Sequence, residues 1–173
     1  NKGDNPENHF NTVLWTGNNA ASRNITGVGF QPDWVWAKDR SAAAYHRLFD
    51  SVRGGDGTGM NILYSNVTSA ESASLGTNGS FSSIDSDGFT ITEGSSSNSA
   101  YNGSSSSYVA WNWLAGGTGV TNDDGSIQST VSANTEAGFS IVSYTGNGTG
   151  GATVGHGLSQ APELVINKNR SVA

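Results

Sequence analysis

The chain has 173 residues, a length that suits one domain with a core large enough to be stable by itself. It contains no cysteine, so disulfides and thiol chemistry are excluded, and its formal charge of −6 argues against a nucleic-acid partner, which needs a basic stripe. No apolar run is long enough for membrane insertion. The polarity comes mainly from Ser, Thr, Asn and Gly, with 24 Gly against 3 Pro, which favours short strands and turns over helices.

Alternation of apolar and polar residues predicts a series of short strands along the chain. In chain order they are residues 12–15, 33–38, 46–50, 62–64, 81–84, 88–92, 108–114, 138–144 and 163–167. Clusters of Gly, Asn, Asp and Ser separate them, and residues 94–107 are predicted to be an exposed low-complexity loop. We therefore expect an all-β fold, an antiparallel β-sandwich or jelly roll with many short strands.

The end of the chain repeats its beginning. FNTVLWTGN (10–18) matches FSIVSYTGN (139–147), and PDWVWAKDRS (32–41) matches PELVINKNRS (162–171). The repeated Pro residues are about 130 residues apart, which is close to a domain length. We expect residues 1–120 to form a first β-sandwich module and residues 121–173 to be a linker with the opening strands of a second copy, or a strand-exchanging tail. The chain would then be a piece of a longer tandem protein, or its end would pair with a neighbour.

Four Trp residues stand in same-face pairs on two predicted strands, because side chains two residues apart point to the same side. The second copy has Leu164 and Ile166 where the first has Trp34 and Trp36, a replacement that core positions permit. A platform for sugar rings is the alternative interpretation. We expect one aromatic core between two sheets, formed by Trp34, Trp36, Trp111 and Trp113.

The best-retained polar run of the repeat is KDRS (38–41) against KNRS (168–171). Arg40 carries a planar guanidinium suited to carboxylates, phosphates or sugar hydroxyls, or it pairs with Asp50 and fixes a turn. The residues that we expect to contact a glycan are Trp15, Arg40, Tyr45 and Tyr101. Those that we expect between subunits, because the partial copy carries apolar residues without matching strands, are Ile141, Tyr144, Leu164 and Ile166.

Catalytic and metal-binding patterns are not recognisable in the sequence. The three His residues are far apart, and no nucleophile elbow or Ser-His-Asp order is present. Asp85 and Asp87 before Gly88 resemble part of a calcium loop, but the twelve-residue pattern with its terminal Glu is missing. We expect a polar turn there rather than a calcium site, no cofactor and no enzymatic activity. A glycosidase acid pair would come from Asp50, Asp85, Asp87 and Glu93.

Several strings in the same order resemble a known family. They are GVGFQPDWVWAKDRS (27–41), YHRLFDSVRG (45–54), SDGF (86–89), YVAWNW (108–113) and GFSIVSYTG (138–146). Together they resemble a module of tail-fibre-like and other virion structural proteins of tailed bacteriophages. The resemblance implies a concanavalin A-like jelly roll that often occurs in tandem, and it implies no catalytic residues.

The expected function is that of a non-enzymatic structural and adhesive module of a phage virion appendage or an extracellular fibre. Its partners would be copies of itself in a homo-oligomer or fibre, and a host cell-surface glycan. Loops displayed in repeated copies bind weakly one by one, and avidity compensates. Two alternatives remain: a carbohydrate-binding module that stacks aromatic rings on sugars, and a polysaccharide hydrolase.

Overall fold

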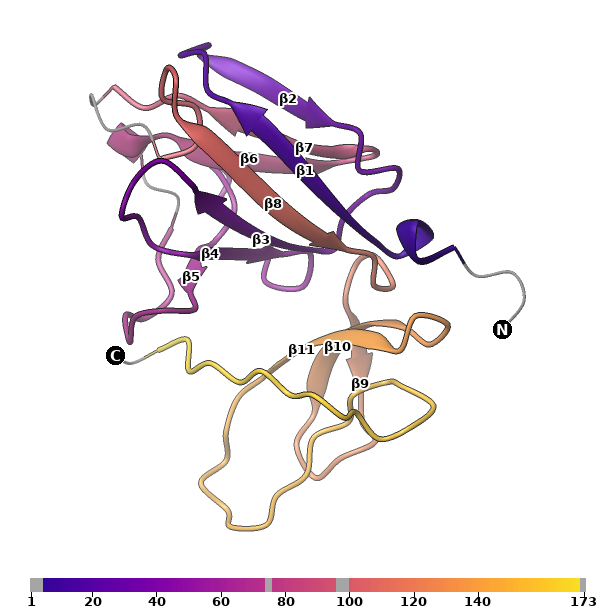
Figure 1. Ribbon diagram of the computed structural model, residues 1–173. Coiled ribbons are helices and arrows are strands. Elements are labelled where there is room, and N and C mark those ends of the chain that lie inside the picture. The colour runs from indigo at the N-terminus through magenta and orange to yellow at the C-terminus, as the bar shows by residue number, and fades with distance from the viewer. Residues whose placement is uncertain (1–4, 74–75, 96–99, 172–173) are drawn as a thin grey trace.

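Residues 5–73, 76–95 and 100–171 are described by the computed structural model, in which the chain forms three antiparallel sheets (Figure 1). In these residues the helical structure is limited to two 3-10 turns, η1 (Pro6–Asn8) and η2 (Gly76–Asn78). The predicted all-β sandwich fold is confirmed. In this part of the chain, no helix is long and apolar enough to cross a lipid bilayer.

The largest sheet has five strands in the order β1-β8-β3-β4-β5. Their bounds are β1 (Phe10–Thr16), β8 (Ser107–Trp113), β3 (Trp34–Asp39), β4 (Arg47–Asp50) and β5 (Leu63–Tyr64). β8 pairs antiparallel with both β1 and β3, so Trp113 stands opposite Phe10 on one side and opposite Trp34 on the other. β1 and β3 consequently run parallel to each other, with β8 between them.

A three-stranded sheet covers one face of the first sheet and closes the sandwich. Its order is β2-β7-β6, with β2 (Ser22–Thr26), β7 (Gly88–Thr92) and β6 (Ser80–Asp85). The core between the two sheets is aromatic: the Phe81 ring stacks on Phe49 at 4.2 Å and on Phe89 at 4.6 Å between centroids. All three are at most 1% exposed, so burial of these rings is the main attraction between the sheets.

The third sheet lies beyond one end of the sandwich, in the order β11-β10-β9 (Figure 1). It consists of β9 (Val120–Asn122), β10 (Ser129–Asn134) and β11 (Phe139–Tyr144). Below, residues 155–171 are called the C-terminal segment; this segment runs back from the third sheet toward β5 (Figure 1). It ends beside the loop after β5, where the Glu71 amide donates to the Arg170 carbonyl at 2.8 Å.

Most predicted strands are present, and three observed strands were not predicted. β2, β9 and β10 lack a clean alternation of apolar and polar residues: β2 contains one buried apolar residue, Ile25, and β9 is mostly exposed. The strand predicted at residues 163–167 is not formed. Its counterpart β3 is paired on both edges, by β4 and β8, whereas no strand pairs with residues 163–167 among the described residues.

The prediction of a Trp core between the sheets was wrong. Trp34, Trp36, Trp111 and Trp113 do share one face, but it is the outer face of the five-stranded sheet, and each is only half-buried. Their neighbours on the same strands point inward and are buried. Because the side-chain period of a strand is two, choosing the wrong member of each alternating pair exchanges the inner and outer faces completely. The inward residues on β3 and β8 are Val35, Ala37, Tyr108 and Ala110.

Candidate functional site

A groove of about 1090 Å³ lies between the outer face of the five-stranded sheet and the third sheet with the C-terminal segment. We call it the aromatic groove. One wall is built by side chains from the first sheet, among them Trp34, Trp36, Leu48, Leu63 and Trp113. The facing wall is built by β11 and the C-terminal segment, with Phe139, Ile141, Leu158, Pro162, Leu164 and Ile166. The strand spacing explains the first wall, because alternate residues of β3 and β8 project to this side.

Ring contacts join the two walls. The indoles of Trp34 and Trp113 lie 4.5 Å apart between centroids, and Phe10 lies 4.8 Å from Trp113. Phe139, from β11, stacks on Trp34 at 5.8 Å and on Trp113 at 6.1 Å. Phe139 was not predicted from the sequence to be a contact residue, although its position matches Phe10 of the first copy.

A Trp–His pair lies beside the groove. The Trp36 Nε1–H donates to Nδ1 of His46 at 2.9 Å, and the two rings meet edge to face at 5.8 Å. Burial lowers the pKa of His46 below its ordinary value, and the nearby Lys38 charge lowers it further. A neutral imidazole is required here, because Nδ1 can accept the indole hydrogen only when it carries no proton.

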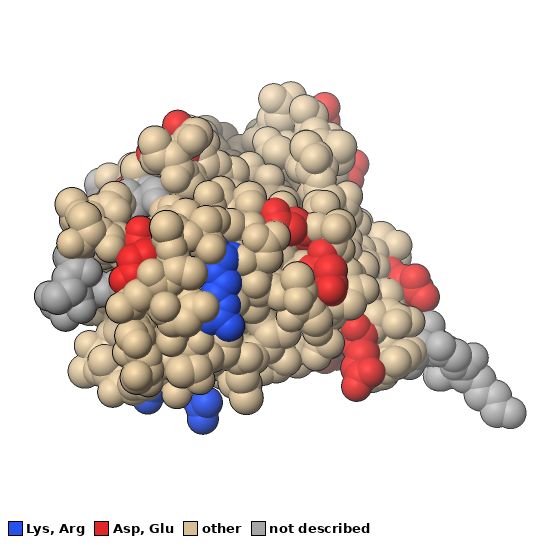
Figure 2. Space-filling model, turned by 90° about the horizontal axis from the view of Figure 1, so that it is seen from above, with Lys and Arg blue, Asp and Glu red and all other residues tan. Residues whose placement is uncertain are grey.

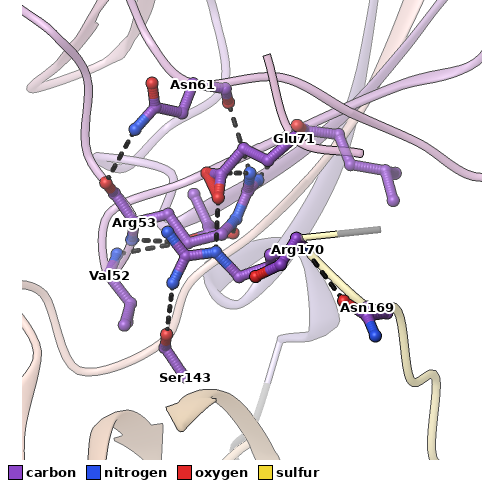
Figure 3. A network of polar contacts seen from close by, with 10 residues as sticks. Val52, Arg53, Asn61, Glu71, Ser143, Asn169 and Arg170 are labelled. Carbon is purple, nitrogen blue, oxygen red and sulfur yellow. Dashed lines mark hydrogen bonds and ion pairs between the residues drawn. The ribbon is translucent and has the colours of Figure 1, made fainter. Parts of the chain in front are cut away.

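One end of the groove is closed by a charged network (Figure 3). The Arg53 guanidinium pairs with Asp50 and, at 3.2 Å, with Glu71. Glu71 also pairs with Arg170 of the C-terminal segment, whose Nη1 donates to the Ser143 hydroxyl of β11 at 2.8 Å. The Arg53 and Glu71 side chains are only 6% and 12% exposed, so the sandwich, the third sheet and the C-terminal segment meet at a partly buried ion network.

The C-terminal segment is held mainly by side chains. Lys168 Nζ donates to the carbonyls of Val67 and Ser69 at 3.2 and 3.0 Å, and Asn167 Nδ2 donates to the Tyr144 hydroxyl at 3.2 Å. Three consecutive apolar side chains of this segment remain exposed, at 79%, 70% and 58%: Leu164, Val165 and Ile166.

The structure brings together three of the four residues predicted to lie between subunits. Ile141, Leu164 and Ile166 all line the aromatic groove, while Tyr144 is 43% exposed and contacts Asn167. The polar anchors of the segment were not identified from the sequence. The repeat contained a signal for them, because Arg170 and Lys168 belong to its best-retained polar run.

The two copies of the repeat share local turns. Asp39 Oδ1 accepts a hydrogen bond from the Ser41 amide at 2.7 Å, and Asn169 Oδ1 accepts one from the Ser171 amide at 2.9 Å. The loops after the first strands match in the same way: Asn18 Oδ1 accepts from the Ala20 amide at 3.1 Å, and Asn147 Oδ1 accepts from the Thr149 amide at 3.0 Å. The correspondence read from the sequence therefore extends to these two turns, although residues 163–167 do not form the strand that β3 forms.

Two residues predicted to contact a glycan, Trp15 and Tyr101, are buried, so that prediction was wrong for them. Trp15 is 8% exposed; it stacks on Tyr108 at 5.2 Å, and its Nε1–H donates to the Tyr101 carbonyl at 3.0 Å. Tyr101 is 1% exposed, with the Arg47 guanidinium 5.0 Å from its ring, and burial raises the pKa of its hydroxyl. Tyr101 belongs to the stretch predicted to be an exposed loop, where apolar burial overrode the low-complexity composition.

The other two glycan-contact candidates are exposed. Tyr45 is 52% exposed and its ring meets Tyr64 edge to face at 5.2 Å. Arg40 is exposed, and the proposed pairing with Asp50 is wrong because that carboxylate pairs with Arg53. The structure does not bring Arg40 or Tyr45 into the aromatic groove.

The acidic residues considered for calcium binding or hydrolysis serve turns and strands. Asp85 accepts hydrogen bonds from Ser83 and Thr90, at 2.8 and 2.7 Å. Asp87 accepts the backbone N–H groups of Gly29 and Gly27, which lower the pKa of its carboxyl. In the described ranges no three His, Asp or Glu side chains gather into a metal-binding group. Figure 2 shows acidic side chains scattered over one face, with no gathered basic patch.

A family model described as a domain of unknown function, DUF7483, matches residues 5–173. The chain belongs to the DUF7483 family. Comparisons with curated proteins and with solved structures found no match. The DUF7483 match covers the sandwich, the third sheet and the C-terminal segment together, so the aromatic groove lies entirely within the matched region.

Proposed function

We propose that this chain is a non-enzymatic structural and adhesive module of a virion appendage or another extracellular fibre, in which it contacts copies of itself. One observation carries the proposal: β11 is hydrogen-bonded to a strand on one edge only within the described residues, and Leu164, Val165 and Ile166 are exposed near it. We call this feature, the free edge of β11 in the third sheet together with Leu164, Val165 and Ile166, the open second sheet, because it belongs to the second copy of the repeat.

An open strand edge next to exposed apolar side chains is a template for pairing with another chain, and proteins normally cover or charge such edges. The segment facing β11 carries no charge between Leu164 and Asn167, so nothing there opposes pairing. In a fibre this contact is heterologous: the open second sheet of one subunit meets a different surface of the next. Heterologous contacts that do not close into a ring generate fibres.

The test is sedimentation velocity of the 173-residue chain over a wide concentration range. Leu164→Arg places a charge in the open second sheet, and Val120→Arg is the matched control, since the two side chains are 79% and 66% exposed and Val120 lies on β9. The proposal expects the wild type and Val120→Arg to associate as concentration rises, and Leu164→Arg to stay monomeric. A wild type that is monomeric throughout, or equal association of both variants, contradicts it.

Carbohydrate binding is the second candidate, and the half-buried indoles favour it. Trp36 and Trp111 meet edge to face at 6.1 Å on the outer face of the sheet, and such rings offer apolar faces with polar edges. A glycan array with the wild type and Trp36→Ile tests this function, because the second copy has Ile166 at the matching position. Binding that Trp36→Ile abolishes supports it, and binding that is absent or unchanged contradicts a role for the indoles.

A hydrolase has no comparable support. Asp50 is engaged by Arg53. Asp85 is held by hydroxyl groups of its own β6–β7 hairpin, and Asp87 by the backbone amides of Gly27 and Gly29 after β2. These carboxylates serve separate local structures rather than facing each other across a cleft, as a glycosidase pair would.

A further inference from the structure

We infer that the aromatic groove receives an extended strand between β11 and the C-terminal segment, in the position that β8 holds in the first sheet. The strand comes from a neighbouring fibre chain, from a segment outside any sheet of its own, and carries large apolar side chains at alternate positions. The inference names the partner of the open second sheet and rests on the proposed function for its role in assembly.

The third sheet and the C-terminal segment correspond to part of the five-stranded sheet. β11 matches β1, with Phe139 in the place of Phe10, and Leu164 stands in the place of Trp34 at the start of β3. In the first sheet, β8 lies between β1 and β3 and bonds to both. In the open second sheet the two matching segments, β11 and the C-terminal segment, are present, but no described strand lies between them.

The two flanking segments, β11 and residues 163–170, do not pair with each other as strands. The hydrogen bonds found between β11 and residues 163–170, in the described part of the chain, run through side chains: Asn167 to Tyr144 at 3.2 Å, and Arg170 to Ser143 at 2.8 Å. Strands two positions apart in a sheet are separated by about 9.5 Å, a distance that Tyr or Arg side chains can bridge but backbones cannot. Among the described residues no backbone hydrogen bond joins β11 to residues 163–170, so the edge of β11 that faces them is left for another strand.

The register of the first sheet gives the order of residues along the gap. In the first sheet, Trp113 stands opposite both Phe10 and Trp34, and Trp111 stands opposite Thr12 and Trp36. By the same register, an incoming residue opposite Phe139 and Leu164 takes the place of Trp113. The residue two before it, opposite Ile141 and Ile166, takes the place of Trp111.

The side of the gap that faces the aromatic groove is mainly apolar. Phe139 stacks on Trp34, so this face of the third sheet lies against the outer Trp face of the five-stranded sheet. Incoming side chains on that face fill a groove walled by indoles and aliphatic groups, which favours aromatic or large aliphatic residues and disfavours charge. The free edge of β11 supplies backbone hydrogen bonds whatever the sequence, so the alternate side chains set the specificity.

The pattern of large apolar side chains at alternate positions limits where the incoming strand can come from. Within this chain it occurs in β8, with Val109, Trp111 and Trp113 on one face, but β8 is already bonded on both edges in its own sheet. A folded second copy can therefore offer only an edge contact. Filling the gap requires a strand that is free before it binds, as in recognition by strand addition.

The experiment adds a peptide with the sequence of residues 107–113, SYVAWNW, to the full chain and measures binding by fluorescence anisotropy of a label on the peptide. We expect saturable binding to the wild type and to Val120→Arg, and binding about tenfold weaker or worse to Leu164→Arg, a loss that corresponds to about 1.4 kcal/mol. A peptide of the same composition with its three large aromatic residues adjacent is the control. Equal binding of both peptides overturns the inference.

The register is tested by disulfide formation, which is site-specific because the chain has no cysteine. Ile141→Cys should cross-link to a peptide with Cys in place of Trp111, since directly opposed Cβ atoms lie about 4.5–5.5 Å apart. Cys in place of Ala110 points to the other face of the strand and should react much less. Equal yields from the two peptides overturn the inference.

Failure of the inference and failure of the proposed function are distinguishable. Self-association of the chain that depends on Leu164, without binding of the peptide, overturns the strand and leaves the proposed function standing. In-register binding of the peptide to a chain that never self-associates supports the strand and overturns assembly with copies of itself.

Discussion

The ring of Phe139 in β11 stacks on the indole of Trp34 in β3, with centroids 5.8 Å apart and an angle of 25° between their planes. The contact connects the third sheet to the outer face of the sandwich, across more than half the length of the chain. It explains why the Trp face is only half-buried: its partner is a sheet that covers part of it and leaves a groove beside the contact.

Replacement of Phe139 by Ala should loosen the third sheet without unfolding the sandwich. The side chain is half-buried, so the expected loss in the free energy of unfolding is about 1–3 kcal/mol, less than for a fully buried Phe. Denaturant titration measures the loss, and faster amide exchange in β10 and β11 localises it. Leu14→Ala, on the outer face of β1 and 63% exposed, is the control and should change neither.

Trp15 and Trp36 should respond differently to truncation. Trp15→Ala removes a buried ring and its hydrogen bond to the Tyr101 carbonyl, and we expect a loss of about 3–5 kcal/mol. Trp36→Ala removes a half-buried ring from the outer face, and we expect about 1–2 kcal/mol, because less apolar area returns to water. Urea unfolding of both variants makes the comparison. Equal losses would contradict the assignment of inner and outer faces.

Acidification should weaken the fold through His46. Burial lowers its folded pKa below the ordinary value of 6.5, so the unfolded chain binds a proton more readily. The stabilising contribution is fully present above pH 6.5 and is lost as the pH falls through the lowered folded pKa. The His46→Asn variant should lose this part of the pH dependence in thermal melts, while a His156→Asn control retains it. An unchanged dependence in His46→Asn would show that Trp36 does not require a neutral ring.

Arg170 should control the position of the C-terminal segment more than global stability. Its side chain is 41% exposed, so the ion pair with Glu71 is largely screened, and we expect Arg170→Ala to cost less than about 1 kcal/mol. The segment should nevertheless become sensitive to limited proteolysis. Arg40→Ala changes the matching residue of the first copy and should leave proteolysis unaltered. Resistance of the Arg170→Ala chain would mean that Lys168 and the groove contacts hold the segment alone.

The sequence predicted the sandwich well because most of its strands alternate clearly between apolar and polar residues. It could not assign the inner face of β3 and β8, since both faces carry apolar residues: Val35 alternates with Trp34 and Trp36, and Ala110 with Trp111. The large size of the Trp side chains suggested that they lie between the two sheets. Apart from Tyr108, the inner face of these central strands instead takes the smaller residues Val35, Ala37 and Ala110, and the rings of Phe49, Phe81 and Phe89 fill the space between the sheets.

The candidate site was predicted in part. Ile141, Leu164 and Ile166 were found because the repeat left apolar residues without matching strands. The network of Arg53, Glu71 and Arg170 was not, because it joins positions far apart in the sequence, and Glu71 stands outside the repeat. Its formation depends on how the C-terminal segment folds back, which no local pattern encodes.

The most direct measurement of the central claim is residue-resolved amide hydrogen exchange in β11 of the full chain at low concentration. The account predicts two classes of amide between Phe139 and Tyr144. Slow amides bond to β10, and fast amides point away from β10 at the free edge of β11. Adding the strand peptide should slow the fast class alone. Slow exchange of every β11 amide before the peptide is added, or fast amides that the bound peptide leaves unchanged, would contradict the account.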